Sequence, residues 1–337
     1  MTPLQERVDM AAFEGKTVLI TGATGLVGSQ CAQALLRHND GLTPKRRVTV
    51  LALVRNEDKA RTMLGEPEGL ELVLGDLESL GSMDLTFDYT IHAGAPTASR
   101  FFMEHPAETA WAIVDGTRNV LEQARRNPGC SVVYLSSMEV YGDGNQVPGL
   151  ENLLHESQVG HVDPMSVRSC YPEGKRMAEN LCADYASEYD VNVKVARLAQ
   201  TFGPGIPKDD GRLFAMIARA GLTGDDIVLK TTGASTRMYS SIDDAVAAIL
   251  TLLLKGHAGE AYNVANEATY SSVRDMAELV SELDGYAHPA VVTDVAPNAP
   301  YPPEHHLPLD TSRLRALGWE PQADLPEMMA ALIESLR

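Results

Sequence analysis

The segment Thr17–Gly28 reads T-V-L-I-T-G-A-T-G-L-V-G and decides the fold. Its first four residues are mostly apolar and predict a strand at Thr17–Ile20, and a helical pattern runs from Leu26 to Arg37. Glycines between a strand and a helix let the backbone turn tightly and approach a pyrophosphate closely. The free N–H groups at the start of the helix then attract the phosphate charge. The segment therefore predicts dinucleotide binding, although a purely structural turn would use the same residues.

Short strands and helices keep alternating along the next part of the sequence. Strands that alternate with helices pair in parallel through right-handed crossovers. We therefore predict the α/β class, with a Rossmann-like doubly wound parallel sheet that binds its ligands at the carboxyl ends of its strands. The further elements expected are strands at Val48–Val54, Leu70–Leu74, Tyr89–Ala93, Ser131–Ser136 and Asn192–Arg197, and long helices at Ala107–Arg126 and Tyr171–Tyr189.

The end of the second strand bears on the choice between NAD and NADP. Arg55 stands where a carboxylate would bind the ribose of NAD, so it favours NADP through its 2′-phosphate, or stacks on the adenine. A solvated surface arginine is the alternative, and the nearby Glu57 and Asp58 leave the choice open. Asp76, after the third strand, is placed to accept a hydrogen bond from the adenine amino group or to cap the next turn.

The character of the sequence changes after Gln200. Phe202–Gly211 is rich in glycine, proline and acidic residues, which predicts a loop, and shorter elements follow it. We expect residues 1–200 to form an NAD(P)-binding Rossmann domain. Residues 201–337 are expected to form mainly a smaller C-terminal substrate-binding lobe, with some segments returning to the first sheet.

Composition excludes several other classes. The net charge of −18 and the absence of a basic run argue against a nucleic-acid partner and against an anionic membrane surface. No apolar run approaches the length of a membrane span. The four cysteines form no C-x-x-C pair and no cluster with zinc spacing, which predicts free thiols and no metal site. The polar N-terminal stretch Met1–Lys16 does not resemble a signal peptide, so a cytoplasmic protein is expected.

Tyr171-Pro172-Glu173-Gly174-Lys175 carries the strongest chemical signal. Tyr171 and Lys175 are four residues apart and share one helix face. A nearby ammonium favours the phenolate and is expected to lower the pKa of the phenol. Ser137 ends the strand that begins at Ser131, where its hydroxyl could bond a substrate oxygen and share its proton with Tyr171. A surface Tyr–Lys pair and a serine that only satisfies the backbone are the alternatives.

With these motifs the sequence resembles the extended short-chain dehydrogenase/reductase superfamily. Within it, the sequence is similar to the NAD(P)-dependent nucleotide-sugar epimerase/dehydratase family, closest to the UDP-glucuronate decarboxylase and dTDP-glucose 4,6-dehydratase branch. The resemblance spans most of the chain and is carried by TGATGLVG, the GDL step at Gly75, IHAGAPT, LSSMEVYG, YPEGK, RLAQTFGPG and STRMYSSIDDAV.

The resemblance implies roles for individual residues and a homodimer. The catalytic residues implied are Ser137, Tyr171, Lys175 and Glu139. The cofactor-binding residues are Gly22, Thr24, Gly25, Leu26, Val27, Gly28, Arg55, Asp76, Leu77, Ala93, Gly94, Ala95 and again Lys175. The substrate-binding residues are Thr97, Gln200, Arg212 and Arg237, of which Arg237 would grip the nucleotide diphosphate.

Departures from the family pattern leave the reaction type open. Dehydratases of this branch carry Asp-Glu and decarboxylases carry Ser-Glu where Met138-Glu139 stands. The decarboxylases also have Asp in place of Pro172, and the family's Asn residues are replaced by Gln200 and Ile113. The main expectation is a nucleotide-sugar epimerase or dehydratase that acts through transient C4 oxidation, with Glu139 as a base. The alternatives are a UDP-uronic acid decarboxylase, an NADPH-dependent carbonyl reductase and a non-catalytic NAD(P)-binding regulator; a cofactor retained in this family is more often NAD.

Overall fold

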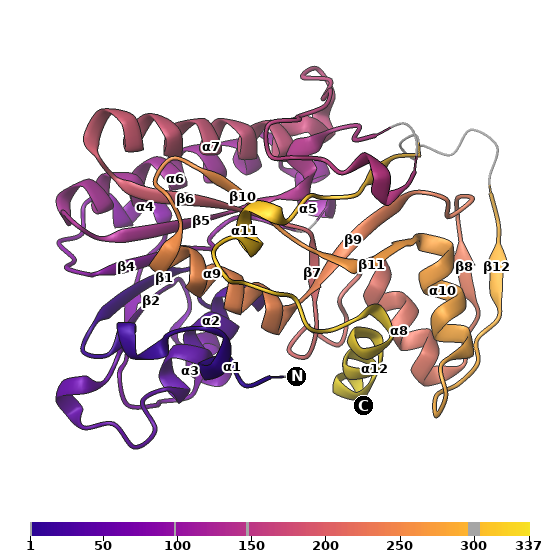
Figure 1. Ribbon diagram of the computed structural model, residues 1–337, viewed down its shortest axis with the longest axis horizontal. Coiled ribbons are helices and arrows are strands. Elements are labelled where there is room, and N and C mark those ends of the chain that lie inside the picture. Colours follow the sequence, from indigo (N-terminus) through magenta and orange to yellow (C-terminus); the bar gives the residue numbers. More distant parts are fainter. Residues whose placement is uncertain (1, 98, 146–147, 296–303) are drawn as a thin grey trace.

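The computed structural model describes residues 2–97, 99–145, 148–295 and 304–337 (Figure 1). Its largest element is a seven-stranded sheet with the order β10-β6-β5-β4-β1-β2-β3, in which every neighbouring pair is parallel. The order 3-2-1-4-5-6 within it is that of two joined mononucleotide-binding halves. The strands are β1 (Thr17–Thr21), β2 (Thr49–Val54), β3 (Leu70–Leu74), β4 (Tyr89–His92), β5 (Ser131–Ser137), β6 (Asn192–Leu198) and β10 (Ala261–Val264).

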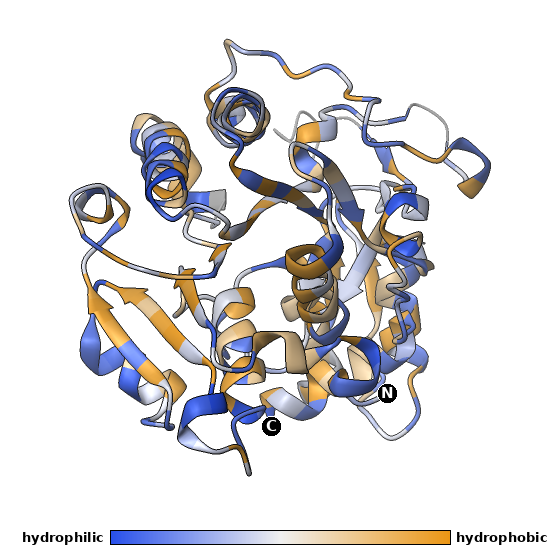
Figure 2. Cartoon of the chain, turned by 60° about the vertical axis from the view of Figure 1, so that its left-hand side comes forward, coloured by the Kyte–Doolittle hydropathy of each residue, from blue (hydrophilic) through white to orange (hydrophobic). Residues whose placement is uncertain are grey.

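Helices cover both faces of this sheet because its strands bury both of their faces. In β1, Val18 and Ile20 pack in the core that contains α2 and α9, whereas Leu19 packs in the core that contains α6 and α7. The strands are largely hydrophobic, and the covering helices carry both hydrophobic and hydrophilic residues (Figure 2). These helices are α2 (Leu26–Arg37), α3 (Glu57–Leu64), α4 (Leu77–Leu80), α6 (Pro106–Arg126), α7 (Cys170–Tyr189) and α9 (Ile242–Lys255), and α1 (Leu4–Arg7) and α5 (Ser99–Glu104) are shorter.

The predicted doubly wound parallel sheet is confirmed by this arrangement. The strands and helices expected from the sequence up to Arg197 are all present, and each of their ends lies within one residue of the predicted position. Short 3-10 helices lie between them at Met10–Phe13, Pro44–Arg46, Met138–Tyr141 (η3), Leu150–Asn152 and Val167–Ser169 (η5).

A second, smaller set of strands and helices follows in the chain (Figure 1). Strand β9 (Thr236–Ser241) pairs with β11 (Asn266–Ser272), β7 (Gln200–Phe202) and β13 (His306–Leu307), and β8 (Ile227–Leu229) pairs with β12 (Val291–Thr293). Their core also contains α8 (Leu213–Thr223), α10 (Val273–Glu282) and α12 (Leu325–Leu336). The short helix α11 (Ser312–Arg315) packs its Leu314 in the core of the larger sheet. Helix α9 and strand β10 come later than residue 200 but belong to the larger sheet, and the division at that residue stays a prediction.

Among the described residues, no helix has both the length and the apolar character needed to cross a lipid bilayer.

Candidate active site

The glycine turn between β1 and α2 is built so that only glycine fits at its two closest contacts. Gly22 has a φ of 67°, and a Cβ there would lie 2.6 Å from the carbonyl carbon of Ala93. A Cβ at Gly28 would lie 2.3 Å from the carbonyl oxygen of Gly22. Helix α2 begins after Gly25 without a side-chain cap, which leaves N–H groups for an anion. The turn therefore fits the pyrophosphate of a dinucleotide.

A buried histidine holds the end of β4 against this turn. The Nδ1 atom of His92 lies 2.7 Å from the hydroxyl oxygen of Thr21, which also accepts the backbone N–H of Gly94 at 3.0 Å. Burial, helped by the positive charge of Lys175, lowers the pKa of His92 to about 3. The imidazole is therefore neutral and structural, and it places residues 93–95 beside the glycine turn.

The other predicted cofactor residues lie along the same edge of the sheet. Arg55 is exposed at the end of β2. Asp76 caps α4, accepting the N–H of Ser79 at 2.8 Å, so the structural alternative for Asp76 is present in the fold. Thr24 belongs to the turn before α2, and Leu26 and Val27 begin that helix, as Leu77 begins α4.

Ser137 and Tyr171 meet where β5 ends and α7 begins. The Ser137 hydroxyl oxygen accepts the backbone N–H of Glu139 at 3.2 Å and thereby caps η3. Ser137 lies close enough to Tyr171 to act on the pKa of its phenol. The Tyr171 ring is buried and stacks on Phe102, with ring centres 4.5 Å apart and planes inclined by 16°. The stacking fixes the phenol beside the serine at the end of β5.

The pKa of Tyr171 is raised above its ordinary value, mainly by burial and further by the negative charge of Glu139. The Ser137 side chain and the positive charge of Arg168 act in the opposite direction. The sequence led us to expect this effect from Lys175. Instead, the Lys175 ammonium donates to the carbonyl oxygen of Leu135 at 2.7 Å, and its Nζ atom lies 5.8 Å from the Tyr171 ring centre. That expectation is therefore corrected: the strand-end carbonyl holds the ammonium, and burial lowers the pKa of Lys175 to about 8.

Glu139 is paired with an arginine that the sequence interpretation did not single out. The Nη2 atom of Arg168 donates to the two carboxylate oxygens of Glu139 at 2.9 and 2.7 Å. The guanidinium also lies 5.0 Å from the Phe102 ring centre and 6.0 Å from that of Tyr171. Its position three residues before Tyr171 was the one feature of the sequence that pointed to Arg168 as a site residue.

A second residue missed in the sequence anchors the strand behind Ser137. Glu179 follows Lys175 by one helical turn, accepts the Ser136 hydroxyl at 2.5 Å and forms an ion pair with Arg197 at 2.7 Å. Glu179 also acts to raise the pKa of Lys175, against the effect of burial. The end of β5 is thus fixed by charges from α7 and β6.

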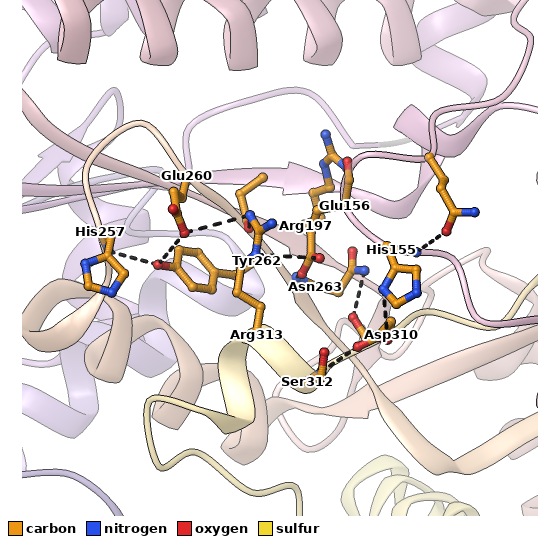
Figure 3. Close-up of polar contacts among 12 residues, drawn as sticks. His155, Glu156, Arg197, His257, Glu260, Tyr262, Asn263, Asp310, Ser312 and Arg313 are labelled. Atoms are coloured by element: carbon orange, nitrogen blue, oxygen red, sulfur yellow. Dashed lines mark hydrogen bonds and ion pairs between the residues drawn. The ribbon is translucent and has the colours of Figure 1, made fainter.

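The anchoring continues into the C-terminal segment (Figure 3). Arg197 donates to the carbonyl oxygen of Glu156 at 2.6 Å, and the carboxylate of Glu156 accepts the N–H of Asn263 at 2.9 Å. The Asn263 amide donates to the carbonyl oxygen of Asp310 at 2.9 Å, and the Asp310 carboxylate pairs with His155 at 2.9 Å. Buried polar contacts therefore connect the active-site strand with residues far along the chain.

The predicted substrate residues occupy different settings. Thr97 is exposed after β4. Gln200 pairs with Tyr239 across β7 and β9, and Arg237 lies two residues earlier on β9. The Nε atom of Arg237 is buried and has no hydrogen-bond partner within the described residues. Arg212 pairs with Asp210 at 2.6 Å and lies over the Phe214 ring.

Comparison with known proteins agrees with this geometry. Residues 18–265 match the model of the NAD dependent epimerase/dehydratase family. The chain belongs to this family. The match includes the glycine turn, Ser137 and Tyr171, and it makes the protein an NAD(P)-dependent enzyme of the epimerase/dehydratase type.

Family relatives extend over nearly the whole chain. It is 30% identical to UDP-glucuronic acid decarboxylase 5 of Arabidopsis thaliana over 325 residues, which are 95% of this chain and 89% of the plant protein. In fold it is similar to the UDP-glucose 4-epimerase of Thermotoga maritima, with a TM-score of 0.78 and 21% identity over 95% of this chain and 98% of that one. It is likewise similar to the dTDP-glucose 4,6-dehydratase DesIV of Streptomyces venezuelae, with a TM-score of 0.77 and 22% identity over 95% and 96%.

Proposed function

We propose that this family member oxidises C4 of the sugar in a nucleoside diphosphate sugar to a transient ketone. The observation that carries the proposal is the buried Tyr171 phenol beside Ser137 at the carboxyl end of β5, with Lys175 one helical turn further along α7. Such a pair, next to a dinucleotide turn, can remove a hydroxyl proton while hydride leaves the same carbon.

Each side chain of this site has a separate role in the proposed oxidation. Tyr171, as the phenolate, takes the proton of the C4 hydroxyl, and the Ser137 hydroxyl stabilises the charge that develops on that oxygen. Lys175 would hold the ribose hydroxyls of the cofactor and would contribute its positive charge. A bound nicotinamide would supply a reversible hydride acceptor beside C4, so the reaction would need no external oxidant.

The ketone at C4 weakens the bonds from C5 to its hydrogen and to C6, and this allows two outcomes. Glu139, two residues beyond Ser137, can remove the C5 proton during dehydration. In a uronic acid, the C5–C6 bond breaks instead: its electron pair moves into the ketone as an enolate, carbon dioxide leaves, and a proton adds at C5. The 30% identity with a plant UDP-glucuronic acid decarboxylase favours this second candidate.

Product analysis in heavy water distinguishes the outcomes. Purified protein is incubated with UDP-glucuronate, UDP-glucose and dTDP-glucose, and C5 is followed by NMR. Deuterium at C5 with loss of carbon dioxide identifies decarboxylation; deuterium at C5 with loss of water identifies dehydration. Epimerisation at C4 leaves C5 unlabelled. If none of the three sugar nucleotides is changed, the proposed function is wrong for these substrates.

Glu139→Gln tests the base directly. It should stop deuterium entry at C5 while reduced cofactor from the C4 step still accumulates. If the variant abolishes C4 oxidation itself, Glu139 positions the substrate and is not the base.

We further propose that the nucleotide diphosphate binds at Arg237, with Thr97, Gln200 and Arg212 as further substrate-binding residues, and that the enzyme is a cytoplasmic homodimer. The unpartnered Nε of Arg237 supports the first assignment. The exposed Trp111 on α6 and Met177 on α7 support the dimer. The four cysteines are free, which suits a reducing compartment.

A further inference from the structure

Arg168 lies between the two acidic groups on which the proposed chemistry depends. Its guanidinium contacts Glu139 through Nη2 and lies over the rings of Phe102 and Tyr171. The Nη1 atom is buried and has no hydrogen-bond partner within the described residues, as for a guanidinium held against aromatic faces. The side chains of Arg168 and Glu139 are 37% and 34% exposed, whereas Tyr171 is buried.

The position of Arg168 compensates the repulsion expected between two negative groups, Tyr171 and Glu139. Both Tyr171 and Glu139 must be negative to accept protons, and like charges close together oppose each other's ionisation. The carboxylate of Glu139 indeed acts to raise the pKa of Tyr171, and Arg168 acts to lower it. Lys175 is already bound to the carbonyl oxygen of Leu135, so its ammonium does not reach Glu139 in place of Arg168.

We propose that Arg168 is a positioning residue of the active site, which pairs with Glu139 above the Tyr171 ring so that a carboxylate and a phenolate can coexist there. The inference rests on the proposed function for the roles of Tyr171 and Glu139. The proposal has a specific consequence. Loss of Arg168 should disfavour the Tyr171 phenolate mainly because the Glu139 carboxylate is left unpaired. Removing the charge of Glu139 should then restore most of the ionisation of Tyr171.

A double-mutant cycle measures this dependence. The C4 oxidation step is followed as reduced nicotinamide in a single turnover, across a range of pH, for the wild type, Arg168→Met, Glu139→Gln and the double variant. The rate of this step should rise with pH as Tyr171 loses its proton. Arg168→Met should move that rise to higher pH by about one to two units, because loss of a nearby opposite charge has effects of that size. At neutral pH the C4 oxidation step should slow by about tenfold for each pH unit of this shift. The double variant should return close to the Glu139→Gln profile, and Arg168→Lys should stay close to the wild type.

A second readout needs no substrate. A fluorinated tyrosine placed at position 171 has a more acidic phenol, which titrates while the protein stays folded and is followed by its absorbance. Its titration should shift upward in Arg168→Met and return when Glu139→Gln is added. If no sugar nucleotide reacts but the titration behaves in this way, the proposed function fails while the role of Arg168 stands.

The matched control is Arg125→Met on α6. Arg125 also pairs with a carboxylate, that of Glu122 at 2.9 Å, and lies 5.2 Å from the ring centre of Tyr189. This variant should leave both readouts unchanged. The proposal is overturned if Arg168→Met shifts neither readout, if the losses in the double variant simply add, or if Arg125→Met gives an equal shift.

Discussion

Ser137 defines the site at the scale of single residues, because its hydroxyl oxygen accepts the N–H of Glu139 at 3.2 Å and its side chain also acts on the pKa of Tyr171. Burial alone would keep Tyr171 protonated, since it disfavours the charged form. The groups that oppose burial, Ser137 and Arg168, come from a strand end and from the turn before α7. The chemistry therefore depends on contacts between segments distant in sequence.

Tyr171→Phe tests the acid–base assignment. The variant keeps the ring and its stacking on Phe102 but lacks the hydroxyl. Turnover should fall by roughly 10²–10⁴-fold, the range typical of lost acid–base catalysis. Cofactor binding, measured by calorimetry, should be retained. Near-normal turnover would show that another group moves the proton.

Arg55→Ala tests cofactor selection. Arg55 is exposed at the end of β2, where it can meet a 2′-phosphate without moving buried groups. If it binds that phosphate, the variant should weaken NADP by about tenfold or more while NAD binding stays nearly unchanged, because a charge-assisted contact contributes about 1.5–3 kcal/mol. Dissociation constants for both cofactors measure this. Equal losses for the two would instead indicate stacking on adenine.

At the scale of elements, helix α7 carries the site because Tyr171, Lys175 and Glu179 recur every four residues along one face. The sequence was sufficient to predict the helix, the Tyr171–Lys175 pair and the strand end at Ser137. It was not sufficient to predict the ion pair of Arg168 or the hydrogen bond of the Lys175 ammonium. Their partners, Glu139 and the carbonyl oxygen of Leu135, are separated from them by 29 and 40 residues, and only the folded chain decides which polar groups meet.

The junction of β1 and α2 gives a prediction of its own. A methyl group at Gly28 would press on the carbonyl oxygen of Gly22, so Gly28→Ala must push the helix away from the turn. We expect weaker cofactor binding and a loss of about 1–3 kcal/mol of stability, as for other overpacked sites. Thermal unfolding and a cofactor titration test both effects. Gly211→Ala is the control, since a Cβ at Gly211 meets no atom within 4 Å; equal losses in the two variants would refute the argument.

Strand β6 contains a buried lysine whose charge should make stability depend on pH. Burial lowers the pKa of Lys194 to about 8 from 10.5, although its Nζ donates to the Ser131 hydroxyl at 2.7 Å. Between these values the unfolded chain binds the proton that the folded chain has released, so stability rises with pH. From pH 7 to pH 10, wild-type stability should therefore gain about 1–3 kcal/mol relative to Lys194→Met. Urea unfolding of both proteins at the two pH values measures the gain; a constant difference would contradict it.

At the scale of the whole molecule, two sheets are tied together by chain segments that cross between them. Helix α9 follows β9 of the smaller sheet but packs under the larger one, and β10 closes the larger sheet before the chain enters β11. The polar contacts around Arg197 and Asn263 bind this crossing to the C-terminal segment (Figure 3). The glycine turn and the alternating pattern predicted the larger sheet, and some later segments were expected to return to it. The sequence did not identify α9 and β10 as those segments, because short elements after Gln200 carry weak periodicity and long-range polar pairs leave no sequence spacing.

The dimer is the prediction that concerns the molecule as a whole. Helices α6 and α7 lie side by side on the same face of the larger sheet (Figure 1), and their outer surface exposes Trp111 by 65% and Met177 by 45%. Each helix is about 30 Å long at 1.5 Å per residue, so the two together present about 600 Å². A stable interface buries about 800 Å² on each partner, which this face and its borders can supply to a second copy.

Trp111→Glu should therefore convert a dimer into monomers, because it would bury a charge in the proposed interface. Sedimentation at micromolar concentration measures the change. Met216→Glu, which alters a methionine on α8 that is 53% exposed, should leave the dimer intact. A wild-type protein that sediments as a monomer would rule out the dimer, and dissociation by both variants alike would place the interface elsewhere. If dissociation also lowers C4 oxidation, α7 offers a physical link, because it packs on α6, its first turn carries Tyr171 and it exposes Met177.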